Sequence, residues 1–205
     1  MTASPAFRRE DPDARRAALI AACARVLARE GAHGTSVRAI ALEAGVSPGL
    51  VGHYFPGIDA LVAATYAQVG ARVDAAHDAA VAAAGEDPRA RLEAFVTASF
   101  AEPVASGELL ATWIAFWSLV RARADIAALH DAQYAAYRAR LEGLLAACGL
   151  EDARRRHAAI ALTALIDGLW LELCLSPGCF TAEEAGAMAR AQIDGYFARS
   201  VNSDR

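Results

Sequence analysis

Hydrophobic residues recur every three to four positions along most of the chain, which is the spacing that places them on one face of an α-helix. Leu19, Ile20, Cys23, Val26 and Leu27 form the first such set. No segment alternates apolar and polar residues in the way that a half-buried strand does. The sequence therefore predicts an all-α protein. With glycine and proline as breaks, the expected helices cover 12–31, two short stretches within 36–55, and then 58–84, 89–102, 107–121, 125–147, 151–175 and 181–199.

The breaks also divide the chain into parts. Residues 1–11 are polar, contain Pro5 and show no period, so a disordered tail is expected there. The Pro56–Gly57 pair separates three helices from the remaining six. We therefore expect a three-helix head over residues 12–57 and a six-helix body over residues 58–205.

The stretch SVRAIALEAGVSPGLVGHYF, residues 36–55, does not fit one helix. Two short apolar sets lie on either side of Gly45. A helix-turn-helix needs a small residue where its helices cross, which Ala41 provides, and a corner residue that tolerates positive φ, which Gly45 provides. The segment therefore predicts a helix-turn-helix, with an ordinary helical hairpin as the alternative.

The second helix of this corner has the features of a DNA-reading helix. Ser47 is placed to cap it and Pro48 to occupy its first turn, which leaves backbone N–H groups free to meet a phosphate. Its outward positions hold Gly49, Leu50, Gly52 and His53. Two glycines permit close approach of the backbone, so we expect this helix to lie in the major groove.

Charge narrows the kind of nucleic-acid binding. The formal net charge is −4, which excludes a strongly basic protein that coats nucleic acid without sequence preference. Residues 1–60 are nearly balanced, with seven Arg against six acidic residues. The chain contains no Lys, so any phosphate contact by a basic side chain must use guanidinium.

Cysteine usage and apolar runs indicate the compartment. Cys23, Cys148, Cys174 and Cys179 show no metal-ligand spacing, and we expect them to be small buried residues in a reducing compartment. No signal-peptide pattern is present, and the longest uncharged apolar run, 109–120, is shorter than the roughly 20 residues that span a bilayer. A cytoplasmic protein with no metal, no cofactor and no membrane partner is expected.

The stretch TSVRAIALEAGVSPGLVGHYFPGIDAL resembles the DNA-binding head of the TetR family of regulators. The likeness lies in a Thr or Ser cap, an Ile-Ala pair, Ala-Gly-Val-Ser and a closing Tyr-Phe. It implies a homodimer whose head binds operator DNA and whose body binds a ligand. DNA contacts are carried onto Ser36, Arg38, Ser47, Pro48, Gly49, His53 and Tyr54. Ile58 stands where the family usually has Lys, so one phosphate anchor is absent.

The body holds all three tryptophans and one unusual carboxylate. Trp113, Phe116 and Trp117 share a helical face, and Asp167 precedes Trp170 by three positions in an apolar helix. Packing in the core is the alternative role for each aromatic residue. Asp167 lies among leucine and isoleucine, so if buried it must line a cavity, bond a backbone turn or meet a cation from another helix.

Three body segments, SF at 99–100, WIAFW at 113–117 and LIDGLWL at 165–171, resemble the choline-responsive branch of the TetR family, the repressors of glycine betaine synthesis. The likeness implies a quaternary ammonium effector such as choline, which aromatic faces and a carboxylate recognise. The candidate ligand-binding residues are Phe100, Glu102, Trp113, Phe116, Trp117, Tyr134, Tyr137, Asp167 and Trp170, with Glu172 as a further carboxylate.

The resemblance also implies that the helices near 151–175 and 181–199 pair with their copies in a dimer. The first is apolar around much of its circumference, and Ala161, Ala164 and Gly168 allow close approach. We therefore predict a ligand-responsive repressor that binds a palindromic operator as a homodimer. A helical ligand-binding module with weak or lost DNA binding is the alternative. An enzyme is not expected, because the five histidines lack a nucleophile context.

Overall fold

The computed structural model describes residues 11–198, so the tail expected over residues 1–11 lies outside the described part except for its last residue. Within it the secondary structure is entirely helical, and each predicted helix is present. The helices are α1 (Pro12–Gly34), α2 (Val37–Glu43), α3 (Pro48–Tyr54), α4 (Ile58–Ala83), α5 (Pro88–Thr97), the 3-10 turn η1 (Ala98–Phe100), α6 (Gly107–Val120), α7 (Ala124–Ala147), α8 (Asp152–Leu175) and α9 (Ala182–Ala198).

Two helix ends differ from the prediction by more than one residue. The helix expected over 89–102 ends at Thr97 and continues as the 3-10 turn, so that Ala101 is already extended. Pro103 disfavours helical backbone at Glu102, so a helix could not continue through residue 102 as predicted. In α1, Gly31 has φ +67 and interrupts the regular helix where a stop was expected, although a further turn continues to Gly34.

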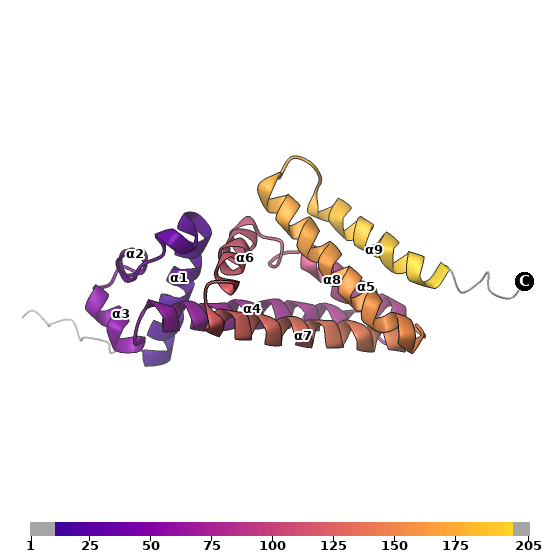
Figure 1. Cartoon of the computed structure of the whole chain (residues 1–205), viewed down its shortest axis with the longest axis horizontal. Coiled ribbons are helices and arrows are strands. Elements are labelled where there is room, and N and C mark those ends of the chain that lie inside the picture. The colour runs from indigo at the N-terminus through magenta and orange to yellow at the C-terminus, as the bar shows by residue number, and fades with distance from the viewer. Residues whose placement is uncertain (1–10, 199–205) are drawn as a thin grey trace, which may run out of the picture.

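The helices are arranged along one long axis, with α1 to α3 gathered at one end (Figure 1). The long helices α4 and α7 run side by side from this head toward the far end, and they pack against each other. Helices α8 and α9 form a hairpin that lies across the body (Figure 1). The chain therefore consists of a small head and a larger helical body. Helix α4 contacts both, since it packs against α1 of the head and against α5 and α7 of the body.

Ion pairs and apolar packing hold the head together. Leu19, Leu27 and Ile40 are fully buried between α1 and α2. On the surface of the same junction, Arg25 Nε lies 2.6 Å and Arg29 Nη1 2.9 Å from the carboxylate of Glu43. Such exposed pairs add little stability individually, about 0–1 kcal/mol each, so burial is the main force that holds the head.

The head and the body share one hydrophobic core. Helix α6 lies against α1, where the Thr112 hydroxyl donates to the carbonyl of Ala24 at 3.4 Å. At the corner between α6 and α7, Arg123 pairs with the Asp59 carboxylate at 2.8 Å and thus binds the first turn of α4. The predicted domain boundary between residues 57 and 58 therefore does not separate two cores, and it stays a prediction about which part binds DNA and which part binds a ligand.

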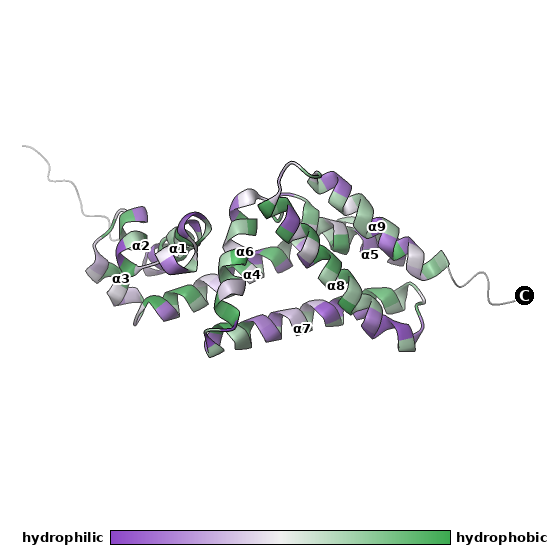
Figure 2. Cartoon of the chain, turned by 45° about the horizontal axis from the view of Figure 1, so that its top comes forward, coloured by the Kyte–Doolittle hydropathy of each residue, from purple (hydrophilic) through white to green (hydrophobic). Residues whose placement is uncertain are grey.

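Helix α8 is the described helix that is long and apolar enough to cross a membrane by length and composition alone, and green residues dominate it in Figure 2. It packs against α6, α7 and α9 and buries Leu162, Ile166 and Trp170. The core helix of a globular protein meets the same criterion, so this helix is weak evidence for a membrane span.

The cysteines follow the prediction only in part. Cys23 is buried, and burial raises the pKa of its thiol to about 11. Cys148 and Cys174 are half-buried, whereas Cys179 is exposed. The expectation that all four are buried is wrong for Cys179, because it lies in the loop between α8 and α9.

Candidate functional site

The corner of the helix-turn-helix has the predicted geometry. Gly45 has φ +66, and a Cβ there would meet no atom within 4 Å, so the backbone conformation and not space requires glycine. The N–H of Val46 donates to the carbonyl of Ala41 at 2.9 Å. Ala41 is buried at the crossing. A backbone hydrogen bond thus closes the corner, and the small side chain of Ala41 lets the two helices approach closely enough to form it.

Helix α3 presents a surface with few structural duties. Ser47 caps it by accepting the N–H of Leu50 at 3.3 Å, and Val51 anchors it in the core. Gly52 and His53 are exposed, and a Cβ at Gly52 would meet no atom within 4 Å. The fold does not require glycine at position 52. Because Gly52 has no side chain, the helix backbone at this position is accessible to a partner.

The predicted DNA contacts lie near one another in sequence and on the surface of the head. Ser36, Arg38, Ser47, Pro48, Gly49 and His53 are exposed, and Tyr54 is half-buried. Ser36 caps α2 by accepting the N–H of Ala39 at 3.2 Å, and its hydroxyl can still donate to a phosphate. Ile58 is half-buried and packs against the core, so apolar packing occupies the place of the absent anchor.

A partly open cavity lies in the body, between α4, η1, α6, α7 and α8. It is lined by Val73, Asp74, His77, Ser99, Trp113, Gln133, Tyr134, Tyr137, Thr163, Ile166, Asp167 and Trp170. The centre of a water-sized sphere can move through about 50 Å³ of it. One water needs roughly 10–15 Å³ on that measure. The cavity therefore has room for a small ligand.

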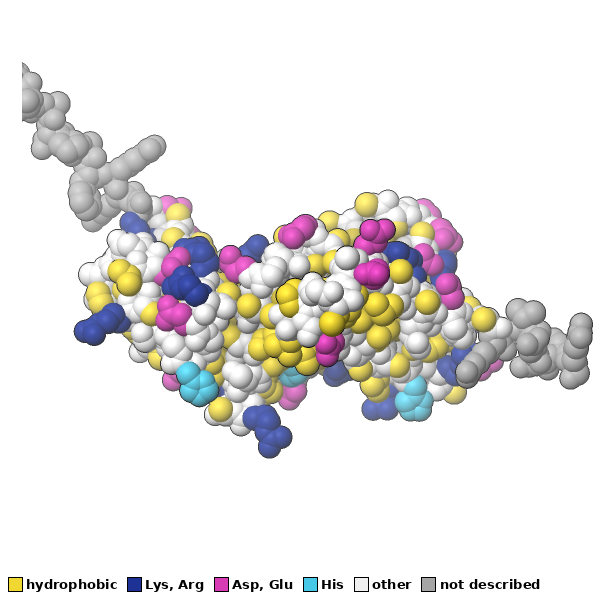
Figure 3. Space-filling view, turned by 90° about the horizontal axis from the view of Figure 1, so that it is seen from above, with side chains coloured by type: hydrophobic (Ala, Val, Ile, Leu, Met, Phe, Trp, Pro, Cys, Tyr) yellow, Lys and Arg dark blue, Asp and Glu magenta, His cyan; other side chains and the backbone are white. Residues whose placement is uncertain are grey.

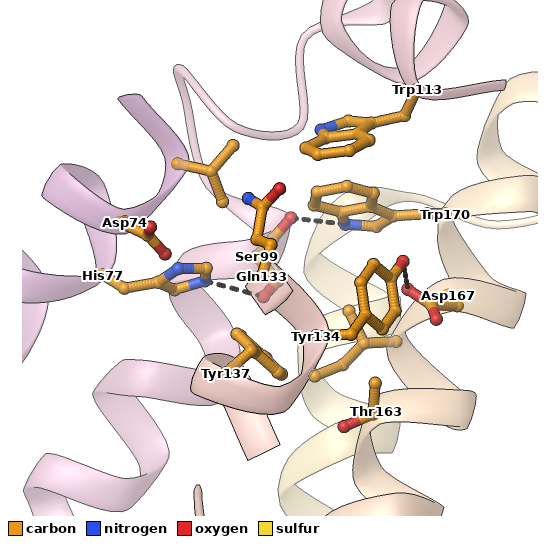
Figure 4. A pocket seen from close by; sticks show the side chains of 12 residues that line it. Asp74, His77, Ser99, Trp113, Gln133, Tyr134, Tyr137, Thr163, Asp167 and Trp170 are labelled. Atoms are coloured by element: carbon orange, nitrogen blue, oxygen red, sulfur yellow. Dashed lines mark hydrogen bonds between the residues drawn. The ribbon is translucent and has the colours of Figure 1, made fainter. Parts of the chain in front are cut away.

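Asp167 provides a carboxylate at one side of the cavity (Figure 4). The Tyr134 hydroxyl donates to its Oδ1 at 3.0 Å, and no cationic side chain of residues 11–198 lies within ion-pair distance. Burial raises the pKa of Asp167 to about 6, while the Tyr134 bond and the more distant Arg138 oppose that shift. The carboxylate is thus ionised at neutral pH without a neutralising partner.

Two indoles form the wall beside this carboxylate (Figure 4). The ring centroids of Trp113 and Trp170 are 6.4 Å apart with a 41° angle between their planes. Trp170 Nε1 donates to the carbonyl of Ser99 at 2.8 Å, which fixes the orientation of that ring. An aromatic wall next to an ionised carboxylate is the chemistry that binds an organic cation.

The structure brings five predicted ligand residues to this cavity and leaves four outside it. Trp113, Tyr134, Tyr137, Asp167 and Trp170 line it. Phe116 is fully buried against Tyr66 and Trp113, so it packs behind the wall. Trp117 and Phe100 also lie outside the lining, and Glu102 is exposed on a separate depression.

The sequence reasoning missed the side of the cavity formed by α4. Asp74 and His77 of α4 line this side, and Ser99 of η1 and Gln133 of α7 also line the cavity; none of the four was a candidate. A usable signal was present, because Val73 and His77 are four residues apart and share the buried face of α4 with Tyr66. Which helix that face would meet could not be read from the sequence.

Comparison with known proteins places the chain in a class of DNA-binding regulators. Residues 19–65 match the model of the bacterial regulatory proteins of the tetR family, and residues 88–198 match the C-terminal domain of BetI-type transcriptional repressors. The second match covers more than half of the chain. The protein belongs to the TetR family of transcriptional regulators, and its body is of the BetI type. Members of this family are regulators and not enzymes.

Individual relatives agree with this assignment. The chain is similar to the HTH-type transcriptional regulator BetI of Burkholderia thailandensis, with 40% identity over 88% of this chain and 92% of the relative. A crystal structure from Pseudomonas aeruginosa PAO1 shares 42% identity with a TM-score of 0.83, covering 93% of this chain and 94% of that one. A Saccharomonospora viridis regulator structure in complex with choline has the same fold, at a TM-score of 0.77 and 22% identity over 90% of this chain and 97% of that one.

Proposed function

We propose that this regulator represses transcription as a homodimer on a palindromic operator and that a quaternary ammonium ion, with choline as the candidate, releases it from DNA. The observation that carries the effector is the unpaired carboxylate of Asp167 beside the two indoles of the cavity. The choline bound to the structurally similar Saccharomonospora protein is consistent with this proposal.

The chemistry of the cavity favours a cation that lacks N–H groups. A primary ammonium would need several oxygen acceptors, whereas a quaternary ammonium needs only apolar and aromatic contact with a nearby negative charge. Trp113 and Trp170 supply the contact and Asp167 the charge. Each is provided by α6 or α8, so a bound ligand would touch both helices.

On the DNA side we propose α3 as the recognition helix. Gly49, Gly52 and His53 form its exposed surface, and Arg38 on α2 is placed for a phosphate or a base. Two such heads in a dimer would enter successive major grooves, so the operator should be an inverted repeat with half-site centres about one helical turn, ~34 Å, or a small extension of it apart.

For the dimer we propose the outward faces of α8 and α9. Of the five large hydrophobic side chains that are exposed within residues 11–198, four lie there, namely Ile160, Leu171, Leu175 and Met188. Ala161, Ala164 and Gly168 are exposed between them. Figure 3 shows hydrophobic side chains gathered over the body. An apolar patch of this kind on a regulator is typical of a subunit interface.

Two helices support a coupling between effector and DNA. Helix α4 starts beside the recognition helix and carries Asp74 and His77 into the cavity. Helix α6 holds Trp113 in the cavity wall, while its Thr112 contacts α1. A ligand that binds one arrangement of α4 and α6 better would shift the population of head positions.

Because the operator lies on the chromosome, we place the protein in the cytoplasm.

Calorimetry with a matched pair of ligands tests the effector. Choline and 3,3-dimethyl-1-butanol have the same shape, but carbon replaces the charged nitrogen in the second. The neutral compound should bind more weakly by roughly 2 kcal/mol, because it loses the cation–π and ionic contributions. Equal binding of the two, or no change in choline affinity in Trp113→Ala and Trp170→Phe, would return these residues to a purely packing role.

A further inference from the structure

The cavity has a second polar side, formed by α4. Asp74 and His77 are three residues apart on this helix, and both line the cavity. In Figure 4 they lie next to each other, across the cavity from Asp167 and Tyr134. The two sides therefore offer separate polar groups to the two ends of one small ligand.

The His77 side chain has an unused hydrogen-bonding atom. It is 1% exposed, its Nε2 lies 3.0 Å from the hydroxyl oxygen of Ser99, and its Nδ1 has no hydrogen-bond partner among the described residues. Burial lowers the pKa of His77 to about 4, so the ring is neutral at pH 7. If the Ser99 hydroxyl donates to Nε2, the single N–H is at Nδ1. A buried N–H without a partner is costly, which indicates that a ligand atom completes it.

Asp74 is likewise without a hydrogen bond or an ion pair within the described residues. Arg140 is the cation that acts electrostatically on Asp74, but its guanidinium is paired with Asp78. The half-buried Asp74 carboxylate can accept a hydrogen bond from a ligand. With His77 in the tautomer that carries its N–H at Nδ1, Asp74 and His77 offer one acceptor and one donor side by side, which matches a hydroxyl group.

We propose that Asp74 and His77 form a hydroxyl subsite, in which the ligand hydroxyl donates to the Asp74 carboxylate and accepts from the N–H of His77 at Nδ1. This inference rests on the proposed function, since Asp167 and the indoles hold the cationic end of the same ligand. The subsite selects a quaternary ammonium that carries a hydroxyl. It disfavours one that carries a carboxylate, because like charges would then meet at Asp74.

Three ligands with the same cationic head test the subsite. Choline carries the hydroxyl, ethyltrimethylammonium lacks it, and trimethylglycine replaces it with a carboxylate. By calorimetry on the full chain at pH 7.5, choline should bind at least about tenfold more tightly than ethyltrimethylammonium, as expected for a hydrogen bond to a charged group. Trimethylglycine should be the weakest of the three.

Asp74→Asn gives changes of opposite sign, which loss of folding cannot imitate. The affinity for choline should fall until it exceeds the affinity for ethyltrimethylammonium by about threefold or less. The affinity for trimethylglycine should instead rise above that of the unchanged protein. His77→Gln should reduce the same choline ratio. Asp59→Asn is the matched control, because Asp59 is exposed on the same helix and does not line the cavity, and it should leave the ratio unchanged.

The outcomes separate this inference from the proposed function. If the unchanged protein binds choline and ethyltrimethylammonium equally, or if Asp74→Asn keeps the full choline preference, the hydroxyl subsite is overturned while the cation site stands. If none of the three ligands binds, the proposed effector is wrong, and the subsite is overturned with it.

Discussion

The head and the body hold their candidate functional residues in opposite environments. On α3, Gly52 and His53 are exposed; a Cβ at Gly52 would meet no atom within 4 Å, and His53 contacts only the edge of the Tyr54 ring among the aromatic residues described. In the body, Trp113 and Trp170 are 3% and 7% exposed and belong to the core. The proposed DNA contacts therefore lie on a surface added to a stable corner, whereas the proposed effector site uses residues that also hold the body together.

This difference predicts how each region responds to mutation. Changes on the outward surface of α3 should alter DNA affinity with little loss of stability. Changes in the cavity should alter stability and ligand affinity together, because a smaller side chain there leaves a void as well as a missing contact. Four substitutions test the contrast, in order of decreasing expected effect.

Trp170→Ala should give the largest effect, a loss of about 3–5 kcal/mol in the free energy of unfolding, since it removes a buried indole. It also leaves the Ser99 carbonyl without its donor. Urea unfolding followed by circular dichroism measures the change. A loss below about 1 kcal/mol would mean that the indole wall is not part of the core.

Asp167→Asn should reduce choline affinity at pH 7.5 by tenfold or more while leaving the fold intact, because the amide keeps the shape and the bond from Tyr134. In the unchanged protein the pKa of Asp167 is raised to about 6. Since a cation favours the ionised carboxylate, choline affinity should fall as the pH drops through about 6 and level off above about 7.

The groups around Asp167 do not reverse that sign. His77, with a pKa of about 4, stays neutral over this range, and burial also raises the pKa of Asp74, so its protonation acts in the same direction. Tyr134 stays protonated, because burial raises its pKa. Asp167→Asn should flatten the step near pH 6, and an unchanged pH profile in that variant would assign the titration elsewhere.

The contrast also explains which features the sequence could predict. The corner depends on neighbours in the chain, so Gly45, Ser47 and the two short helices follow from local rules of φ angle and capping. Trp113, Asp167 and Trp170 were found from their residue types and from the family resemblance. Asp74 and His77 were missed, because their place in the cavity depends on α4 meeting α7 and η1, contacts between distant segments that periodicity does not specify.

Gly52→Ala should produce a smaller effect with opposite signs in the two measurements. Alanine favours a helix interior over glycine by about 0.5–1 kcal/mol, and a Cβ there meets open space, so the protein should become slightly more stable. Operator affinity should decrease, because the methyl group separates the backbone from the groove. Thermal unfolding and fluorescence anisotropy on one preparation measure both, and unchanged DNA affinity would remove α3 from the interface.

Ile58→Lys should have the smallest effect on stability, because the half-buried position can hold the lysine stem with its amine in solvent. If the start of α4 lies near the DNA backbone, operator affinity should rise and the salt dependence should steepen by about one charge. Ile58→Gln is the neutral control. An identical salt slope in both variants would place this helix start away from phosphate.

The most direct measurement is operator affinity with and without saturating choline, by fluorescence anisotropy on the intergenic DNA beside the gene, with footprinting to define the repeat. We expect tight binding to an inverted repeat that weakens about 5- to 150-fold when choline binds, the usual range of coupling between two sites. Asp167→Asn should bind the same DNA with far less response to choline. If calorimetry shows choline bound while operator affinity is unchanged, the proposed repressor mechanism is contradicted, and if no operator binds at all, the chain is a ligand-binding module without DNA binding.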